Sequence, residues 1–124
     1  MSTGFKVQAQ ADHIHVELAP SYAIPSQDTK QLITAIADHC ARHCCRRVLI
    51  QGSRVPGGIK ALDAYALGSL MGSLLPGASF AFCLNGYSPD ANAKFLIDVT
   101  HNRGVRLKFF DDPEAALRWL RPKN

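Results

Sequence analysis

The stretch that decides the fold is residues 48–84, VLIQGSRVPGGIKALDAYALGSLMGSLLPGASFAFCL. Residues 48–50 and 80–84 are short apolar runs with the β-branched or aromatic content of strands that are buried on both faces. Between them, residues 61–75 predict a helix, which Pro76 and Gly77 end. A strand, a helix and a second strand in this order predict a right-handed crossover between two parallel strands.

Upstream of this unit, the sequence predicts a β-hairpin and then a helix. Residues 5–9 and 13–18 each alternate apolar and polar side chains, and Asp12 provides a turn between them. The alternation predicts that Ile14, Val16 and Leu18 form the inner face of the second strand, and that His13, His15 and Glu17 lie together on its other face. Ser26 is a candidate N-cap for the helix, whose apolar face runs to about Cys45.

Downstream, the sequence predicts one more helix, one more strand and a final helix. Ser88 and Pro89 suit the start of the first of these helices, and Gly104 suits a left-handed cap at its end. Residues 105–109 form the last strand, and Asp111 or Asp112 caps the final helix. We therefore expect one α/β domain over residues 1–124: a β-hairpin followed by βαβ-type units, with a mixed, mostly parallel sheet of about five strands and about four helices.

Composition narrows the function classes. The 124 residues are 47% hydrophobic and 19% charged, with a net charge of +4, which is typical of a folded globular chain. The N-terminus lacks a secretory signal and no apolar run is long enough to span a bilayer, so we expect a cytoplasmic protein without a transmembrane segment. Lys and Arg are scattered without interleaved aromatics, which argues against nucleic-acid binding. The spacing of the four cysteines is not CxxC and the chain is not a small secreted one, so they are interpreted as reduced thiols.

The C-terminal stretch, residues 102–120, carries a resemblance to a known family. It reads NRGVRLKFFDDPEAALRWL, with a strand that ends in Phe-Asp and a short helix that ends in Trp-Leu. This stretch and the order of elements resemble the SpoIIAA-like proteins of the STAS superfamily. In that family the second helix begins with Asp-Ser-Ser and then Gly-Leu-Gly, and a partner kinase phosphorylates the first serine.

The corresponding segment here is residues 62–70, LDAYALGSL. Asp63 and Gly68 match the family pattern, but Ala64 occupies the position of the switch serine and has no hydroxyl to phosphorylate. The resemblance thus implies a non-catalytic regulatory or protein-binding domain, similar to anti-sigma-factor antagonists but without their phospho-switch.

The predicted binding site lies after the strand at residues 48–50. Ligands of open α/β sheets favour the carboxyl ends of strands, and helix N-termini attract anions. The candidate binding residues are Ser53, Arg54, Gly57, Gly58, Lys60, Asp63 and Tyr65. The alternative, in which Pro-Gly-Gly is a plain turn and the loop only connects two elements, stays open.

A second cluster, residues 39–45, reads HCARHCC and contains histidine and cysteine pairs at helical i, i+4 spacing. Such pairs can chelate a metal, but Cys40 and Cys44 also continue the apolar helix face. We therefore predict buried thiols, no bound metal and no cofactor. No nucleophile–base pair is legible, so we predict no catalytic residues and no enzyme activity.

Two alternatives remain at this point. The Ala- and Gly-rich residues 61–72 could leave room beneath a helix, as in a carrier or sensor of an apolar, lipid-like or anionic ligand. Self-association as a homodimer, through an edge strand or the helix faces, is the other. The expected partner is a protein or a small ligand.

Overall fold

The computed structural model describes residues 5–19, 29–53, 61–85 and 91–121, and it has the predicted α/β architecture. The strands in these ranges are β1 (Phe5–Ala9), β2 (Ile14–Leu18), β3 (Arg47–Ser53), β4 (Ser79–Asn85) and β5 (Arg106–Phe110). The helices are α1 (Thr29–His43), α2 (Ala61–Leu74), α3 (Ala91–Asn102) and α4 (Pro113–Leu120). None of the described helices is long and apolar enough to cross a membrane.

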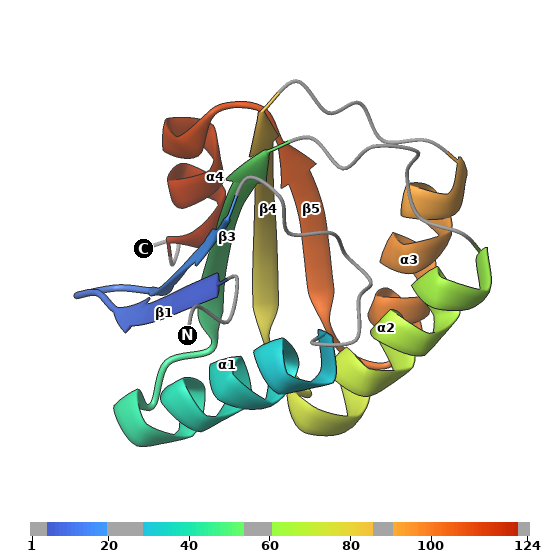
Figure 1. The fold of residues 1–124 in the computed structure, drawn as a ribbon, viewed down its shortest axis with the longest axis horizontal. Coiled ribbons are helices and arrows are strands. Elements are labelled where there is room, and N and C mark those ends of the chain that lie inside the picture. The colour runs from blue at the N-terminus through green and yellow to red at the C-terminus, as the bar shows by residue number, and fades with distance from the viewer. Residues whose placement is uncertain (1–4, 20–28, 54–60, 86–90, 122–124) are drawn as a thin grey trace.

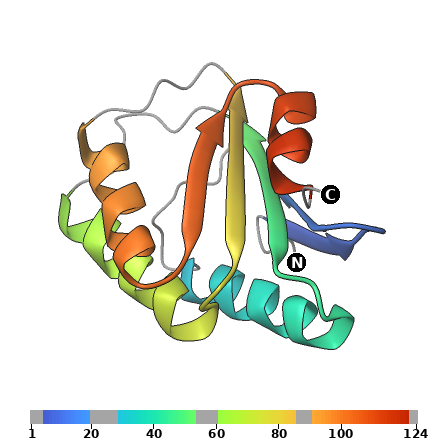
Figure 2. The ribbon, with the colours of Figure 1, turned by 180° about the vertical axis from the view of Figure 1, so that it is seen from behind.

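The strands lie side by side in chain order, β1-β2-β3-β4-β5. β1 and β2 form the predicted antiparallel hairpin at one edge, and every other neighbouring pair is parallel. Successive right-handed crossovers that step in one direction place their helices on the same face. Accordingly, α1, α2 and α3 cover one face of the sheet and α4 lies on the other (Figures 1 and 2).

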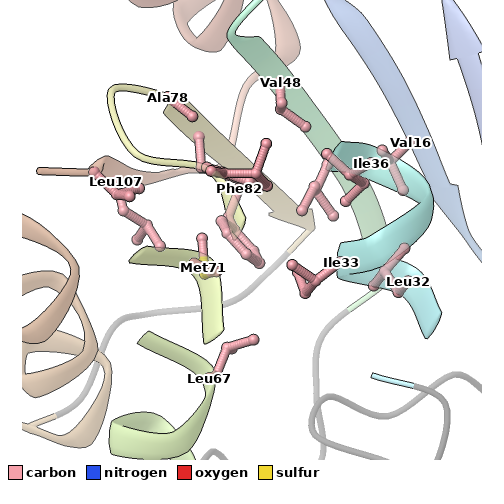
Figure 3. Packing of buried hydrophobic residues seen from close by; sticks show 14 of the residues in the cluster. Val16, Leu32, Ile33, Ile36, Val48, Leu67, Met71, Ala78, Phe82 and Leu107 are labelled. Atoms are coloured by element: carbon pink, nitrogen blue, oxygen red, sulfur yellow. The ribbon is translucent and has the colours of Figure 1, made fainter. Parts of the chain in front are cut away.

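The main hydrophobic core fills the space between the sheet and α1, α2 and α3 (Figure 3). Met71 of α2 and Ile33 of α1 point toward Phe82 of β4 in the middle of this core. Burial of each large side chain contributes about 1.5–3 kcal/mol relative to exposure to water. Val48 and Ile50 of β3 face this layer and are fully buried.

A smaller core lies under α4, on the opposite face of the sheet. Leu49 of β3 and Ala81 of β4 pack there against Ala116 and Leu120 of α4. Because alternate residues of β3 point into different cores, its apolar run is continuous, as the sequence predicted. The cap of α4 is Asp112, whose Oδ1 accepts a hydrogen bond from the Glu114 backbone N–H at 3.3 Å.

Two glycines allow α2 and α3 to pack closely. A Cβ on Gly68 would come 2.6 Å from Cγ1 of Val99, and one on Gly72 would come 2.5 Å from Cβ of Arg103. Both distances are shorter than a side chain tolerates, so only glycine permits this approach of the two helices. Gly68 and Gly72 are therefore explained by helix–helix packing, and the carrier alternative stays a prediction.

Candidate binding sites

The predicted binding residues have different outcomes. Arg54, Gly57, Gly58 and Lys60 lie outside the residues that the structure describes. The backbone of Ser53 ends β3 and pairs with Asn85 of β4, and Asp63 lies in the first turn of α2. Tyr65 is on the outer side of α2 and is 49% exposed. The predicted binding site in the loop after β3 thus stays a prediction. Of the seven predicted binding residues, Tyr65 is the one whose side chain the structure describes in contact with a neighbour.

The topology adds a point about the carboxyl end of the sheet. The helices that follow β3 and β4 lie on the same face, whereas α3 after β4 and α4 after β5 lie on opposite faces. In open α/β sheets the ligand crevice forms where the strand order reverses. The described order β1-β2-β3-β4-β5 does not reverse, so the divergence of α3 and α4 does not by itself mark such a crevice. Sequence reasoning did not predict this divergence, because the face that a terminal helix covers is not encoded in its own periodicity.

The outer surface of α2 and α3 carries exposed large apolar side chains. We define the α2–α3 patch as Leu62, Tyr65 and Phe95, which are 83%, 49% and 39% exposed. Gly68 lies against Val99 and Gly72 lies against Arg103, so α2 and α3 run side by side in the same direction. One turn before the contact of Gly68 with Val99, Tyr65 of α2 and Phe95 of α3 lie at about the same height along the two helices. The patch therefore spans both helices near their N-terminal ends.

A cationic side chain borders this patch. The guanidinium carbon of Arg103 lies 5.3 Å from the centre of the Tyr65 ring, and Arg103 Nη2 donates a hydrogen bond to the Tyr65 hydroxyl at 3.4 Å. These contacts hold the ring in place on the surface by a cation–π interaction. The patch thus has a positioned aromatic side chain as well as a freely exposed leucine.

Helix α2 is unusual because its apolar residues are not confined to one side. Asp63 is the only charged residue in its sequence, ALDAYALGSLMGSL. Its inner side is filled by Leu67 and Met71, yet Leu62 on the other side is exposed. Helices that are apolar all round are normally covered on every side. The outer side of α2 thus resembles a surface that another molecule covers.

A hollow of about 600 Å³ opens at the amino end of the parallel strands, between the C-terminal ends of α1 and α2. We call it the Arg46 pocket. Its lining residues come from α1, the segment before β3, the end of α2 and the start of β4: Ala37, Cys40, Ala41, Cys44, Arg46, Arg47, Leu74, Leu75, Pro76 and Ala78. Sequence reasoning assigned Arg46 only to the end of a helix and did not predict this pocket.

Arg46 is the distinctive charged residue of this pocket. Its guanidinium lies over Gly77, where a Cβ would come 2.9 Å from Nη1, and Gly77 has a φ of +82°. The neighbouring Arg47 is already engaged, because its Nε donates to the Asp12 carbonyl oxygen at 2.9 Å. Among the described residues, no ion pair or side-chain hydrogen bond includes Arg46.

The two cysteines in the pocket differ in accessibility. Cys40 is buried, as predicted, and burial raises the pKa of its thiol to about 11. Cys44 is exposed, so the prediction that it continues the buried face was wrong. The reason is that α1 ends at His43 and not at about Cys45, and the positive φ of Cys44, +49°, turns the chain out of the helix.

The histidines of this cluster are His39, which is half-buried, and His43, which is exposed. His39 Nδ1 is 3.0 Å from the Ala35 carbonyl oxygen, and the rings of His39 and His43 are stacked at 6.2 Å. In the described ranges no three His, Cys, Asp or Glu side chains gather as metal ligands would. The local contacts of these residues are therefore explained by the helix itself.

The polar face of the hairpin forms a small network around Asp12. His13 Nδ1 lies 2.7 Å from Asp12 Oδ1, and Arg121 Nε lies 3.6 Å from Oδ2. The hydrogen bond with His13 is the main reason that the pKa of Asp12 is lowered. His15 and Glu17 share this face, as predicted, at 3.8 Å. The network joins the turn after β1 to the end of α4, which is a structural role.

Comparison of the chain with protein-family models, with curated proteins and with solved structures gives no match.

Proposed function

We propose that this chain is a non-catalytic protein-binding domain whose binding surface is the α2–α3 patch. Its role is similar to that of the SpoIIAA-like and STAS proteins that its sequence resembles, without their phospho-switch. The observation that carries the proposal is the exposure of Leu62, Tyr65 and Phe95 on two adjacent helices, one of which is apolar on all sides.

The energetics favour a partner at this surface. Burial of a leucine as exposed as Leu62 contributes roughly 1.5–3 kcal/mol to an association. Tyrosine and arginine are the residue types that most often dominate interface energies, and Tyr65 and Arg103 form such a pair here. Contact with Arg103 reduces the mobility of Tyr65 before binding, which lowers the entropy lost on association.

The charges beside the patch indicate the chemistry of the partner. Lys94, Asp98 and Arg103 on α3 and its end, and Asp63 on α2, balance in charge beside the patch. The charged residue that a described contact joins to a patch side chain is the cation Arg103. The whole chain has a net charge of +4. We therefore infer a partner protein that presents apolar side chains bordered by carboxylates, since complementary charge speeds association and excludes wrong partners.

Ala64 supports a constitutive mode of binding. It occupies the position of the family's switch serine, has no hydroxyl, and is completely buried in α2. Phosphorylation at this position therefore cannot regulate the surface. Binding would be governed by the concentration of the partner.

Site-specific photo-crosslinking tests this function. A photoreactive phenylalanine analogue is placed at residue 62, or at Gln31 on the exposed side of α1 as the matched control, in the full chain expressed in its native cells. We expect a discrete crosslinked protein from position 62 and none from position 31. The captured protein is then purified and titrated against the chain.

In that titration Leu62→Ser should weaken binding about tenfold or more, whereas Gln31→Ala should change it less than about twofold. Both positions are exposed, so neither change should lower the thermal midpoint appreciably. Equal crosslinking from both positions, or an unchanged affinity for Leu62→Ser, would contradict the proposal. A crosslink to a second copy of the chain would replace the foreign partner with self-association.

A further inference from the structure

We infer that the Arg46 pocket is a second, separate site, which binds a small monocarboxylate with an apolar chain. A guanidinium without a described partner and several apolar side chains line the same hollow. This site lies where the strands begin, whereas the α2–α3 patch lies near the N-terminal ends of its helices. The inference therefore does not depend on the proposed function.

The charge of the ligand follows from the arginines at this end of the molecule. Arg42 is paired with Asp38 at 3.0 Å, and Arg47 donates to the Asp12 carbonyl oxygen. Arg46 is the pocket arginine without a described partner. A planar guanidinium matches the two oxygens of a carboxylate in a bidentate hydrogen-bonded pair, so an anionic headgroup fits this position.

The helix ends limit the ligand to a single negative charge. α1 and α2 both end at this pocket, and helix C-termini carry partial negative charge. A phosphate dianion would be repelled by these ends more strongly than a carboxylate. Both Arg46 and Arg47 line the pocket, and the hydrogen bond of Arg47 to a neutral carbonyl leaves its charge in place. The preference for a single negative charge therefore rests on repulsion by the two helix ends.

The walls determine the rest of the ligand. Ala37 and Ala41 have side chains too small to fill the hollow, and together with Leu74 and Pro76 they supply the apolar part of its lining. Leu74 is 39% exposed and would be covered by a bound chain. The volume of about 600 Å³ lies within the range of small-molecule sites, about 300–1,000 Å³. An apolar chain attached to the carboxylate would therefore contact Ala37, Ala41 and Leu74.

Calorimetric titration of the full chain with octanoate tests the inference. We expect saturable binding with a Kd between about 10 µM and 1 mM, as suits a small ligand in a half-open site. Octylamine has the same chain with the opposite charge, and inorganic phosphate has charge without the chain. Neither should bind within a factor of about ten of octanoate.

Two variants locate the site. Arg46→Gln should weaken octanoate binding about tenfold or more, whereas Arg42→Gln, at the same end of α1 but outside the pocket, should change it less than about twofold. Ala41→Trp, on an exposed position of α1, should block the hollow and also abolish binding. It keeps the test valid if Arg46→Gln fails to fold.

The inference would be overturned by octylamine or phosphate binding as tightly as octanoate, by full affinity in either Arg46→Gln or Ala41→Trp, or by no binding of octanoate at 10 mM, about ten times the weakest expected Kd. None of these outcomes bears on crosslinking at residue 62. The two proposals therefore fail independently.

Discussion

Helices α1 and α3 end in the same way but with different residues in the key position. At the end of α3, the Val105 N–H donates to the Thr100 carbonyl oxygen at 2.8 Å, and Gly104 between them has a φ of +83°. At the end of α1, the Cys45 N–H donates to the Cys40 carbonyl oxygen at 3.1 Å. Both are Schellman-type ends, in which a residue of positive φ follows the last helical turn.

The residue of positive φ is glycine in one case and cysteine in the other. Gly104 adopts this conformation without steric cost, whereas a side chain at the same φ costs roughly 1–2 kcal/mol. Cys44, with a φ of +49°, therefore carries backbone strain that the end of α3 avoids. In return, α1 places an exposed thiol at the edge of the Arg46 pocket. The difference between the two ends can be tested by chemistry and by substitution.

The largest expected effect is in thiol alkylation. Iodoacetamide should modify Cys44 in the folded protein, whereas Cys40 should react about 100-fold more slowly or only after unfolding. Cys40 is buried and its pKa is about 11, so about one thiol in a thousand is ionised at pH 8. Labelling read residue by residue by mass spectrometry checks this, with Cys44→Ala as the control that removes the fast phase.

The same pKa fixes the pH dependence of Cys40. Its value in the folded protein is higher than the ordinary value of 9.0, so folding favours the neutral thiol. This contribution to stability is fully present below pH 9.0 and is lost as the pH rises through about 11. Fast labelling of native Cys40 at pH 8 would show that the thiol is not buried as described.

The next largest effect is on the free energy of unfolding, at the residue that follows the one with positive φ: Val105 after Gly104 and Cys45 after Cys44. Val105 is 1% exposed, so Val105→Ala should lower the free energy of unfolding by about 2–3 kcal/mol. Cys45 is only half-buried, and Cys45→Ala should lower it by about 0.5–1 kcal/mol. Urea unfolding of both variants provides the measurement. Equal losses would mean that the two helix ends are anchored equally well in the core.

These two ends also show what a sequence can predict. Gly104 was predicted as a left-handed cap, because glycine is the usual residue in that conformation. Cys44 was not, because cysteine at i, i+4 from Cys40 is typical of a continuing apolar face. The i, i+4 spacing of the cysteines favoured a longer helix, but the positive φ of Cys44 ends α1 at His43.

The same distinction applies to the rest of the molecule. The hairpin, the buried strands and the cap of α4 were predicted, because periodicity and N-capping act over a few neighbouring residues. The Arg46 pocket was not, because its walls come from segments as distant as Ala37 and Ala78. The α2–α3 patch was found only at Tyr65, since the pairing of α2 with α3 depends on tertiary contacts at Gly68 and Gly72.

A smaller effect is expected at Gly104 itself. Gly104→Ala should lower the free energy of unfolding by about 1 kcal/mol. The strain of alanine at a φ of +83°, roughly 1–2 kcal/mol, is partly offset because alanine also lowers the entropy of the unfolded chain by about 0.5–1 kcal/mol. A Cβ at this position would meet no atom within 4 Å, so no steric clash adds to this loss. Gly104→Asn, which tolerates positive φ better, should recover part of it in the same urea titration. An unchanged stability for Gly104→Ala would mean that this end of α3 does not need glycine.

The smallest effect, and the reverse in sign, is expected for Cys44→Gly. Glycine removes strain of roughly 1–2 kcal/mol at this φ but adds about 0.5–1 kcal/mol of conformational entropy to the unfolded chain. The net result should be a gain of about 0.5–1 kcal/mol in the free energy of unfolding, measured by urea titration under reducing conditions. Cys44→Ala, which removes the sulfur but keeps a Cβ, should leave stability within about 0.5 kcal/mol of the original. If Cys44→Ala stabilises as much as Cys44→Gly, the thiol and not the backbone is the source of strain. If neither does, the end of α1 accommodates a side chain at positive φ as readily as the end of α3 accommodates glycine.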